Sequence, residues 1–205
     1  DDQPFEGYFS KEAEKKLKTI TGRKHAFIVT SGTAGIHVML LAQGIKPGDE
    51  VICVNHSAPA TAMAIASLGA QPVFVDLDNY GSMDCDQVEQ AITSKTKAIL
   101  ATGLYGDSHD HDRIKDLGVP ILNDSCQSFC ASYKGTECTK LGDMSIISFS
   151  SNKICPVFGT YGAVMTDNDH LAEKISLVRR NGYAHRDVPN GIRYLGINAQ
   201  PCENK

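Results

Sequence analysis

Short apolar runs and amphipathic segments alternate along most of the chain. The apolar runs are rich in Val, Ile and Leu, which favours buried strands, whereas the segments between them carry apolar residues at helical spacing. Strands are predicted over residues 26–30, 51–54, 72–78, 97–102, 119–124, 144–150 and 163–168, and helices over 10–21, 31–44, 59–68, 85–92, 110–118 and 170–180. This alternation predicts an α/β protein with a doubly wound, mostly parallel sheet flanked by helices.

The two ends of the chain are less regular. Ser10 opens the first helical segment, where its hydroxyl can accept a hydrogen bond from a free backbone N–H, so we expect it to be the N-cap. Residues 181–205 are rich in Gly, Asn and Pro without periodicity, which is typical of a loop. Because no repeat or linker interrupts the pattern, residues 1–205 are predicted to form one domain, with residues 1–22 as an N-terminal helical segment.

Composition and charge exclude several classes of protein. The chain has 205 residues, a net charge of −4 and no basic cluster of the size that nucleic-acid binding requires. It shows no signal peptide and no apolar run approaching about 18 residues, so we expect a cytoplasmic protein without a membrane span. The seven cysteines include no CxxC pair, which favours buried reduced thiols over a zinc site.

Polar groups directly follow several predicted strands, at the edge where sheets of this class bind their ligands. The first group is the glycine turn Ser31–Ala34, which opens a helix. Free backbone N–H groups and the positive end of the helix dipole suit a phosphate there, and Thr33 adds a hydroxyl donor. An ordinary strand-to-helix turn with a threonine cap is the alternative. The turn matches neither a Walker A loop nor GxGxxG, so the dinucleotide fingerprint is absent.

Asp124 and Lys153 mark two further groups of this kind. Asp124 ends a very apolar strand, so its carboxylate is expected to be largely out of water and paired, as with a protonated heterocyclic nitrogen; capping of the next segment is the alternative. Lys153 lies in a predicted loop shortly after Ser148, among small and apolar residues. Partial desolvation there favours a neutral, nucleophilic amine, whereas a solvated surface lysine is the alternative.

The three groups together supply what one cofactor requires. Pyridoxal 5′-phosphate (PLP) needs a phosphate cradle, a carboxylate for its ring nitrogen and an amine for its aldehyde. Ser31–Ala34, Asp124 and Lys153 offer these in turn. The residues therefore predict a PLP site, and no metal.

Several blocks of the sequence also resemble, in order, one family: "SGTAGIHVMLLAQGIKPGDEVI", "GAQPVFVDLD", "AITSKTKAIL", "LYG", "NDSCQSFCASYKG" and "GDMSIISFSSNK". They are similar to the DegT/DnrJ/EryC1/StrS aminotransferases, fold-type I PLP enzymes that aminate keto sugars, usually nucleotide-linked, in surface-glycan and antibiotic pathways. The resemblance runs from about Phe5 to about Asn198. It implies that residues 1–205 are the PLP-binding large domain of such an enzyme, without the family's small C-terminal domain.

The resemblance also implies roles for individual residues. Lys153 matches the lysine that forms the Schiff base with PLP and then acts as general base and acid, and Asp124 matches the carboxylate on the pyridine nitrogen. Gln127 matches the residue that packs by the cofactor ring and its 3′-oxygen. The phosphate binders of the family correspond to Thr33 and Ala34, next to Gly32, together with Ser148.

Partners follow from the same resemblance. Asn198, in "LGIN", resembles an asparagine that reaches the phosphate of the neighbouring subunit. The implied protein is a homodimer with shared active sites, in which residues 183–205 form a loop region reaching toward the partner. The implied substrates are an amino donor, usually glutamate, and a small-molecule keto sugar.

The sequence departs from the family at three places. Ala58 stands where an aromatic residue usually stacks on the PLP ring, so either His56 covers the ring or the stacking is lost. Gln200 replaces an arginine expected to hold a carboxylate, and the residues after Lys153, "ICPVFGTYG", differ from the usual turn. These departures bear on turnover more than on cofactor binding.

Two other functions remain open from the sequence. The first is a non-catalytic module that binds PLP or a nucleotide sugar, or that pairs with a longer partner. The second is a dinucleotide-dependent dehydrogenase, which the missing glycine fingerprint disfavours.

Three histidines that could touch substrate are expected instead to be ordinary surface or loop residues: His109, His111 and His185.

Overall fold

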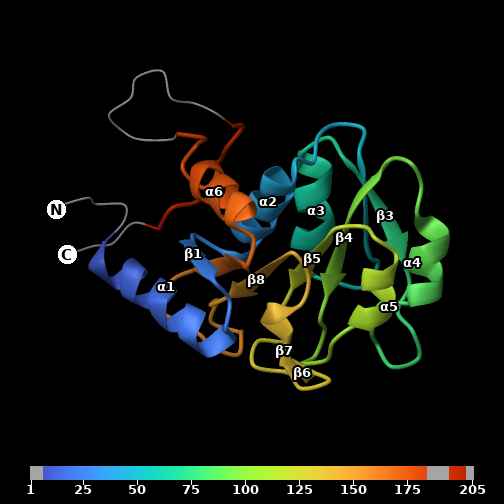
Figure 1. Ribbon diagram of the computed structural model, residues 1–205, viewed down its shortest axis with the longest axis horizontal. Coiled ribbons are helices and arrows are strands. Elements are labelled where there is room, and N and C mark those ends of the chain that lie inside the picture. Colours follow the sequence, from blue (N-terminus) through green and yellow to red (C-terminus); the bar gives the residue numbers. More distant parts are fainter. Residues whose placement is uncertain (1–6, 184–193, 202–205) are drawn as a thin grey trace.

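The computed structural model describes residues 7–183 and 194–201, which fold into helices around one large sheet (Figure 1). The helices are α1 (Tyr8–Thr21), α2 (Gly32–Gln43), α3 (Pro59–Ser67), α4 (Cys85–Ala91), α5 (His111–Asp116) and α6 (Asp169–Val178), with a 3-10 turn at Cys138–Lys140. The strands are β1 (His25–Val29), β2 (Glu50–Val54), β3 (Gln71–Val75), β4 (Thr96–Thr102), β5 (Ile121–Asp124), β6 (Ser132–Tyr133), β7 (Thr136–Glu137), β8 (Met144–Ser148) and β9 (Gly162–Thr166).

The large sheet has seven strands in the order β1-β9-β8-β5-β4-β2-β3, and the predicted α/β fold is confirmed. Strands β3, β2, β4, β5 and β8 pair in parallel, whereas β9 runs antiparallel to both β8 and β1. The reversal at β9 has a local cause, because residues 149–161, which join β8 to β9, contain no helix that could carry the chain back for a parallel crossover.

Helices cover both faces of the sheet, as the apolar runs of its strands require. Alternate residues of β2 enter different core clusters: Val51 and Cys53 pack with α2, α3 and α6, whereas Ile52 and Val54 pack with α4 and α5. Helix α1 packs against β1 and covers a third cluster on the side of α4 and α5. Figure 1 shows α2, α3 and α6 gathered along one side of the sheet.

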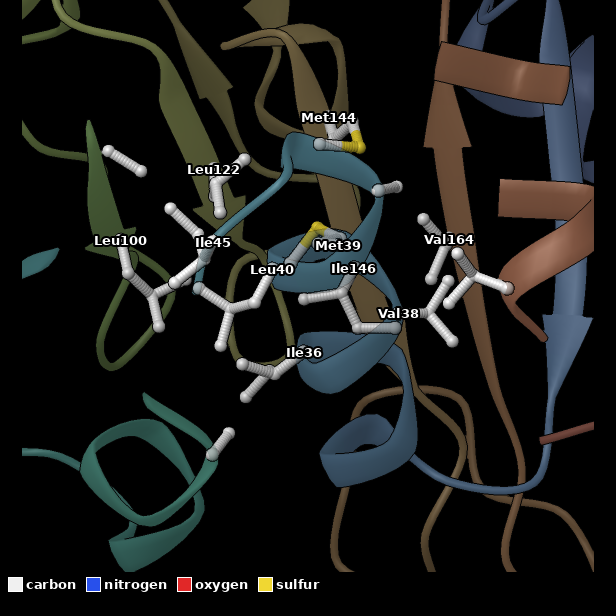
Figure 2. Packing of buried hydrophobic residues seen from close by; sticks show 14 of the residues in the cluster. Ile36, Val38, Met39, Leu40, Ile45, Leu100, Leu122, Met144, Ile146 and Val164 are labelled. Atoms are coloured by element: carbon white, nitrogen blue, oxygen red, sulfur yellow. The ribbon is translucent and has the colours of Figure 1, made fainter. Parts of the chain in front are cut away.

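Helix α2 is the central element of the larger cluster. Ile36, Met39 and Leu40 are fully or almost fully buried and lie among strand residues such as Ile146 (Figure 2). A Cβ atom at Gly35 would collide with the side chain of Ile146. Glycine therefore lets α2 lie close on β8, and this contact fixes where the first turn of α2 meets the carboxyl ends of the strands.

The start of the first helix differs from the prediction. Helix α1 begins at Tyr8 after Gly7, which makes no side-chain cap hydrogen bond, so the expectation that Ser10 is the N-cap was wrong. Tertiary contacts position the helix instead. Glu14 Oε1 accepts hydrogen bonds at 2.9 Å from the Ile28 amide and from Arg179 Nη1, and these tie α1 to β1 and to the end of α6.

Part of the predicted C-terminal loop is packed against the fold. The Ile197 amide donates to Val178 O at 2.9 Å, and the Thr30 amide donates to Ala199 O at 3.0 Å, next to the turn that opens α2. Ala199 is fully buried. The remainder of the proposed partner-reaching region, residues 184–193 and 202–205, lies outside the described residues.

A short hairpin, β6–β7, was missed from the sequence. Its turn places Lys134 and Gly135 at φ values of 48° and 81°, and a two-residue hairpin turn of this kind needs positive φ at both positions. Glycine takes that conformation readily, whereas lysine does so only rarely, which is why the turn signal is weak.

Candidate functional site

A cavity of about 150 Å³ lies at the carboxyl ends of β4, β5 and β8, against the first turn of α2. Six of the predicted site residues line it: Gly32, Thr33, Asp124, Gln127, Ser148 and Lys153. The outermost of these residues, Gly32 and Lys153, are separated by more than half the chain. The sheet brings them together because the parallel strands end at one edge.

Two larger hollows lie elsewhere and contain none of the predicted site residues. One, of about 510 Å³, surrounds Arg23 near the amino ends of β5 and β8. The guanidinium of Arg23 is already bonded to Asp167 and to carbonyl oxygens of Thr139, Leu141 and Gly142. The other, of about 600 Å³, is a mainly apolar groove beside α1. The smaller cavity therefore concentrates the reactive groups.

The first turn of α2 forms an anion-binding cradle. Ser31 is the N-cap, and its Oγ accepts a hydrogen bond from the Ala34 amide at 3.0 Å. The amides of Gly32 and Thr33 precede the first possible acceptors within the helix and remain available at the positive end of its dipole. A Cβ atom at Gly32 would lie 3.0 Å from Ser148 Cβ, so glycine leaves room there for a ligand to approach the backbone.

Ala34 contributes less than expected to this cradle. Its amide hydrogen is taken by Ser31, and the residue is not part of the cavity wall. The alternative suggested by the sequence, a turn capped by a threonine, was wrong about the capping residue, because Ser31 and not Thr33 caps the helix. Capping and anion binding do not conflict, since the cap occupies the Ala34 amide and leaves those of Gly32 and Thr33.

Asp124 is the last residue of β5 and only 6% exposed. Its Oδ1 accepts a hydrogen bond from the Cys126 amide at 3.0 Å, so the carboxylate does cap the following turn. Burial raises the pKa of Asp124, while hydrogen bonds from Cys126 and the charge of Lys153 oppose that rise. A buried carboxylate of this kind is stabilised by a cationic partner inside the cavity.

Lys153 lies in the loop after β8, five residues beyond Ser148. Its amide donates to Ser150 O at 2.9 Å, and its side chain is half-buried in the cavity wall. The ammonium group lies near enough to Asp124 to lower the pKa of that carboxyl. The alternative of a fully solvated surface lysine does not fit this position.

Gln127 connects the cavity to a pair of rings at its rim. Its Oε1 accepts a hydrogen bond from the Tyr105 amide at 3.3 Å, and Tyr105 Oη lies 2.9 Å from His56 Nε2. Tyr105 has a φ of 54°, which is unusual for an aromatic residue. His56 thus faces Tyr105 and is not part of the cavity wall, which holds Ala58 at that point.

Asn198 is not brought to this cavity within the chain. It is exposed and forms an isolated β-bridge with Arg180. Its expected role concerns the site of a neighbouring subunit, so that role stays a prediction. Gln200, in place of the expected arginine, also lies outside the cavity wall.

Of the histidines set aside from the sequence, His109 and His111 do not line the cavity either. His109 lies in the loop between β4 and α5, as expected, but it is buried there and only 1% exposed. Burial lowers the pKa of His109 to about 4, and the charge of the neighbouring His111 adds a smaller effect in the same direction. His185 lies outside the described residues.

Thr102 and Cys126 are among the cavity residues to which no role was assigned from the sequence. Both stand at or just after a strand end, so the rule that singled out Asp124 could have found them. Burial and the Asp124 carboxylate raise the pKa of the Cys126 thiol well above its ordinary value, which keeps it protonated.

The expectation that the cysteines are buried holds for only some of them, because Cys130 and Cys155 are exposed.

Residues 7–183 and 194–201 contain no group of three or more His, Cys, Asp or Glu side chains placed to hold a metal ion. Over the same residues, every helix is too short or too polar to cross a bilayer.

Comparison with known proteins identifies relatives of this chain. Among curated relatives, the chain is 38% identical over 180 residues to the UDP-2-acetamido-2-deoxy-3-oxo-D-glucuronate aminotransferase of Pseudomonas aeruginosa, covering 85% of this chain and 50% of that protein. It is 37% identical over 181 residues to the GDP-perosamine synthase of Caulobacter vibrioides, covering 86% and 48%. The chain spans about half the length of the curated relatives it matches.

The chain is also similar to several solved structures. The S. venezuelae DesV structure, in complex with a ketimine intermediate, superposes with a TM-score of 0.91 at 30% identity, over 98% of this chain and 55% of that one. The NtdA structure from Bacillus subtilis, with bound cofactor PMP, gives 0.88 at 32% identity, over 96% and 45%. The model of the DegT/DnrJ/EryC1/StrS aminotransferase family matches residues 2–200, and this chain belongs to that family.

Proposed function

We propose that this chain carries the cofactor site of a PLP-dependent sugar aminotransferase, which moves an amino group from glutamate to a keto sugar, usually nucleotide-linked. The observation that carries the proposal is the convergence of Lys153, Asp124 and the α2 cradle on one cavity. Relatives named as aminotransferases of oxidised sugars support the reaction class.

The cavity residues fit PLP by their chemistry. Gly32, Thr33 and Ser148 offer amides and hydroxyls to a phosphate at a helix N-terminus, where the dipole favours an anion. Asp124 offers a buried carboxylate to a pyridinium nitrogen, and Lys153 offers an amine to an aldehyde. When bound, PLP supplies an electron sink that stabilises a carbanion next to the amino nitrogen.

The chain's own residues would perform the remaining tasks. Lys153, released from the aldehyde by the donor's amine, would act as general base and acid and move one proton during each half of the reaction. Asp124 would hold the ring nitrogen in its protonated form, because a buried carboxylate gains most from a cationic partner. Gln127, held by the Tyr105 amide, would contact the ring edge.

We also propose a cytoplasmic homodimer with shared sites. Asn198 is exposed and lies outside the cavity of its own chain, which suits a residue that serves the partner's phosphate. Residues 183–205 would then reach toward the second subunit.

A second candidate function is binding without turnover. Gln200 stands where a carboxylate-binding arginine is expected, and Ala58 rather than an aromatic side chain lines the cavity. A module of this kind would bind PLP or a nucleotide sugar, or pair with a longer partner.

Turnover distinguishes the two functions. Incubation of the chain with PLP, L-glutamate and a panel of nucleotide-linked keto sugars should release 2-oxoglutarate in amounts equal to the amino sugar formed, measured by coupled assay and mass spectrometry. Matched reactions with D-glutamate, or without the keto sugar, should form no amino sugar. PLP binding without any 2-oxoglutarate would exclude the aminotransferase and leave the binding module.

A further inference from the structure

Thr102 is the last residue of β4 and lies beside the proposed ring-nitrogen partner. It pairs in register with Asp124 on the neighbouring parallel strand, which places both side chains on the same face of the sheet. It is 4% exposed and belongs to the cavity wall. Its Oγ1 is buried and makes no hydrogen bond to any group that the structure describes.

Other buried threonines of the described chain satisfy their hydroxyls. Thr21 Oγ1 donates to Leu17 O at 2.8 Å, Thr166 Oγ1 donates to Asp143 O at 2.7 Å, and Thr61 Oγ1 lies 2.9 Å from Ser57 Oγ. A buried hydroxyl without a partner loses its hydration and receives no hydrogen bond in return. The exception at Thr102 therefore coincides with the cavity, where a ligand can provide the missing partner.

The side chain can reach such a ligand without movement of the backbone. Rotation about the Cα–Cβ bond of a threonine exchanges the positions of its hydroxyl and methyl groups between staggered wells. Thr102 already contributes to the cavity wall. The hydroxyl can thus turn toward a polar atom of the ligand when the ring occupies the space beside Asp124.

We propose that Thr102 is a further cofactor-binding residue, whose hydroxyl makes its hydrogen bond to a polar atom of the bound PLP ring next to Asp124. This inference rests on the proposed function. It predicts that the hydroxyl is unfavourable for the cofactor-free fold and favourable for the complex. A purely structural threonine would instead stabilise the free protein.

Thr102→Val tests the inference because valine keeps the shape and removes the hydroxyl. The ligand is pyridoxine 5′-phosphate, which has no aldehyde, so its Kd reports non-covalent contacts alone. Calorimetric titration should give a Kd about 10-fold higher than for the wild type, equivalent to ~1.4 kcal/mol. Thr102→Ser should bind like the wild type, and Thr102→Ala should repeat the loss if the valine variant folds poorly.

Thr166→Val is the matched control, since it removes a buried hydroxyl that is hydrogen-bonded and not part of the cavity wall. It should lower the melting temperature of the cofactor-free protein and leave the Kd unchanged, whereas Thr102→Val should leave that temperature equal or raise it. Wild-type affinity in Thr102→Val and Thr102→Ala would overturn the assignment of Thr102. Absence of binding by the wild type would overturn the proposed function itself, and this assignment with it.

Discussion

Lys153→Ala is expected to eliminate the absorbance band that PLP develops on the wild-type chain near the visible edge, and to lower amino transfer by about 10²–10⁴-fold. Lys153 is the lysine of the cavity wall, and no other lysine of the described chain lines it. The variant would lose both the amine that holds the aldehyde and the group that moves the proton. Spectral titration with PLP and the 2-oxoglutarate assay measure the two losses.

Two further variants distinguish the covalent and proton-transfer role of Lys153 from the effect of its positive charge. Lys46→Ala removes an exposed lysine in the connection between α2 and β2, away from the cavity, and should keep both the band and the rate. Lys153→Arg keeps a positive charge near Asp124 but provides no nucleophilic amine, so it should bind the phosphate without developing the band. A band of wild-type size in Lys153→Ala would contradict the role of Lys153.

Asp124→Asn is expected to lower amino transfer by about 10²–10³-fold while stabilising the cofactor-free protein. Asparagine keeps an oxygen for the Cys126 amide, so the turn after β5 is retained. It cannot hold the ring nitrogen in its protonated form, which weakens the electron sink. The rate assay measures the first effect, and thermal unfolding without cofactor measures the second.

The stabilising effect has a defined dependence on pH. Burial raises the pKa of Asp124 in the folded chain above the value of 3.8 that it has when solvated. The folded wild type therefore binds more protons than the unfolded chain in this window, and its stability falls as the pH rises from about 3.8 through the raised pKa.

Asparagine has no such titration, so the advantage of Asp124→Asn in melting temperature should grow over that window and then stay constant. Asp124→Glu, which keeps the carboxylate, should not show this advantage. A cofactor-free Asp124→Asn variant that is less stable than the wild type at pH 7 would show that the carboxylate supports the fold itself.

The sheet could be predicted because most of its strands are buried on both faces. Short apolar runs such as residues 51–54 and 97–102 are typical of strands in the interior of a sheet. The helices between them return the chain to the start of the next strand, so neighbouring strands are parallel. The antiparallel β9 and the hairpin β6–β7 were not predictable in this way, since both depend on short connections. The position of α1 against the sheet depends on Glu14 and Arg179, which are far apart in the sequence.

The candidate site was predictable where a strand end gave the signal. Asp124 and Ser148 are the last residues of apolar strands, and the glycine turn at Gly32 opens a helix. The position of His56 at the rim, facing Tyr105, depends on a contact between two loops that no local pattern encodes. The lack of a hydrogen-bond partner for Thr102 Oγ1 depends on the tertiary packing around it, which no local sequence pattern encodes.

One measurement tests the central claim most directly. The wild-type chain is incubated with PLP, reduced with borohydride, digested and analysed by mass spectrometry. The account predicts a single phosphopyridoxyl group on the peptide that contains Lys153, and a large reduction of this label when excess pyridoxine 5′-phosphate competes for the cavity. Label spread over exposed lysines such as Lys46 and Lys97, with none on Lys153, would contradict it.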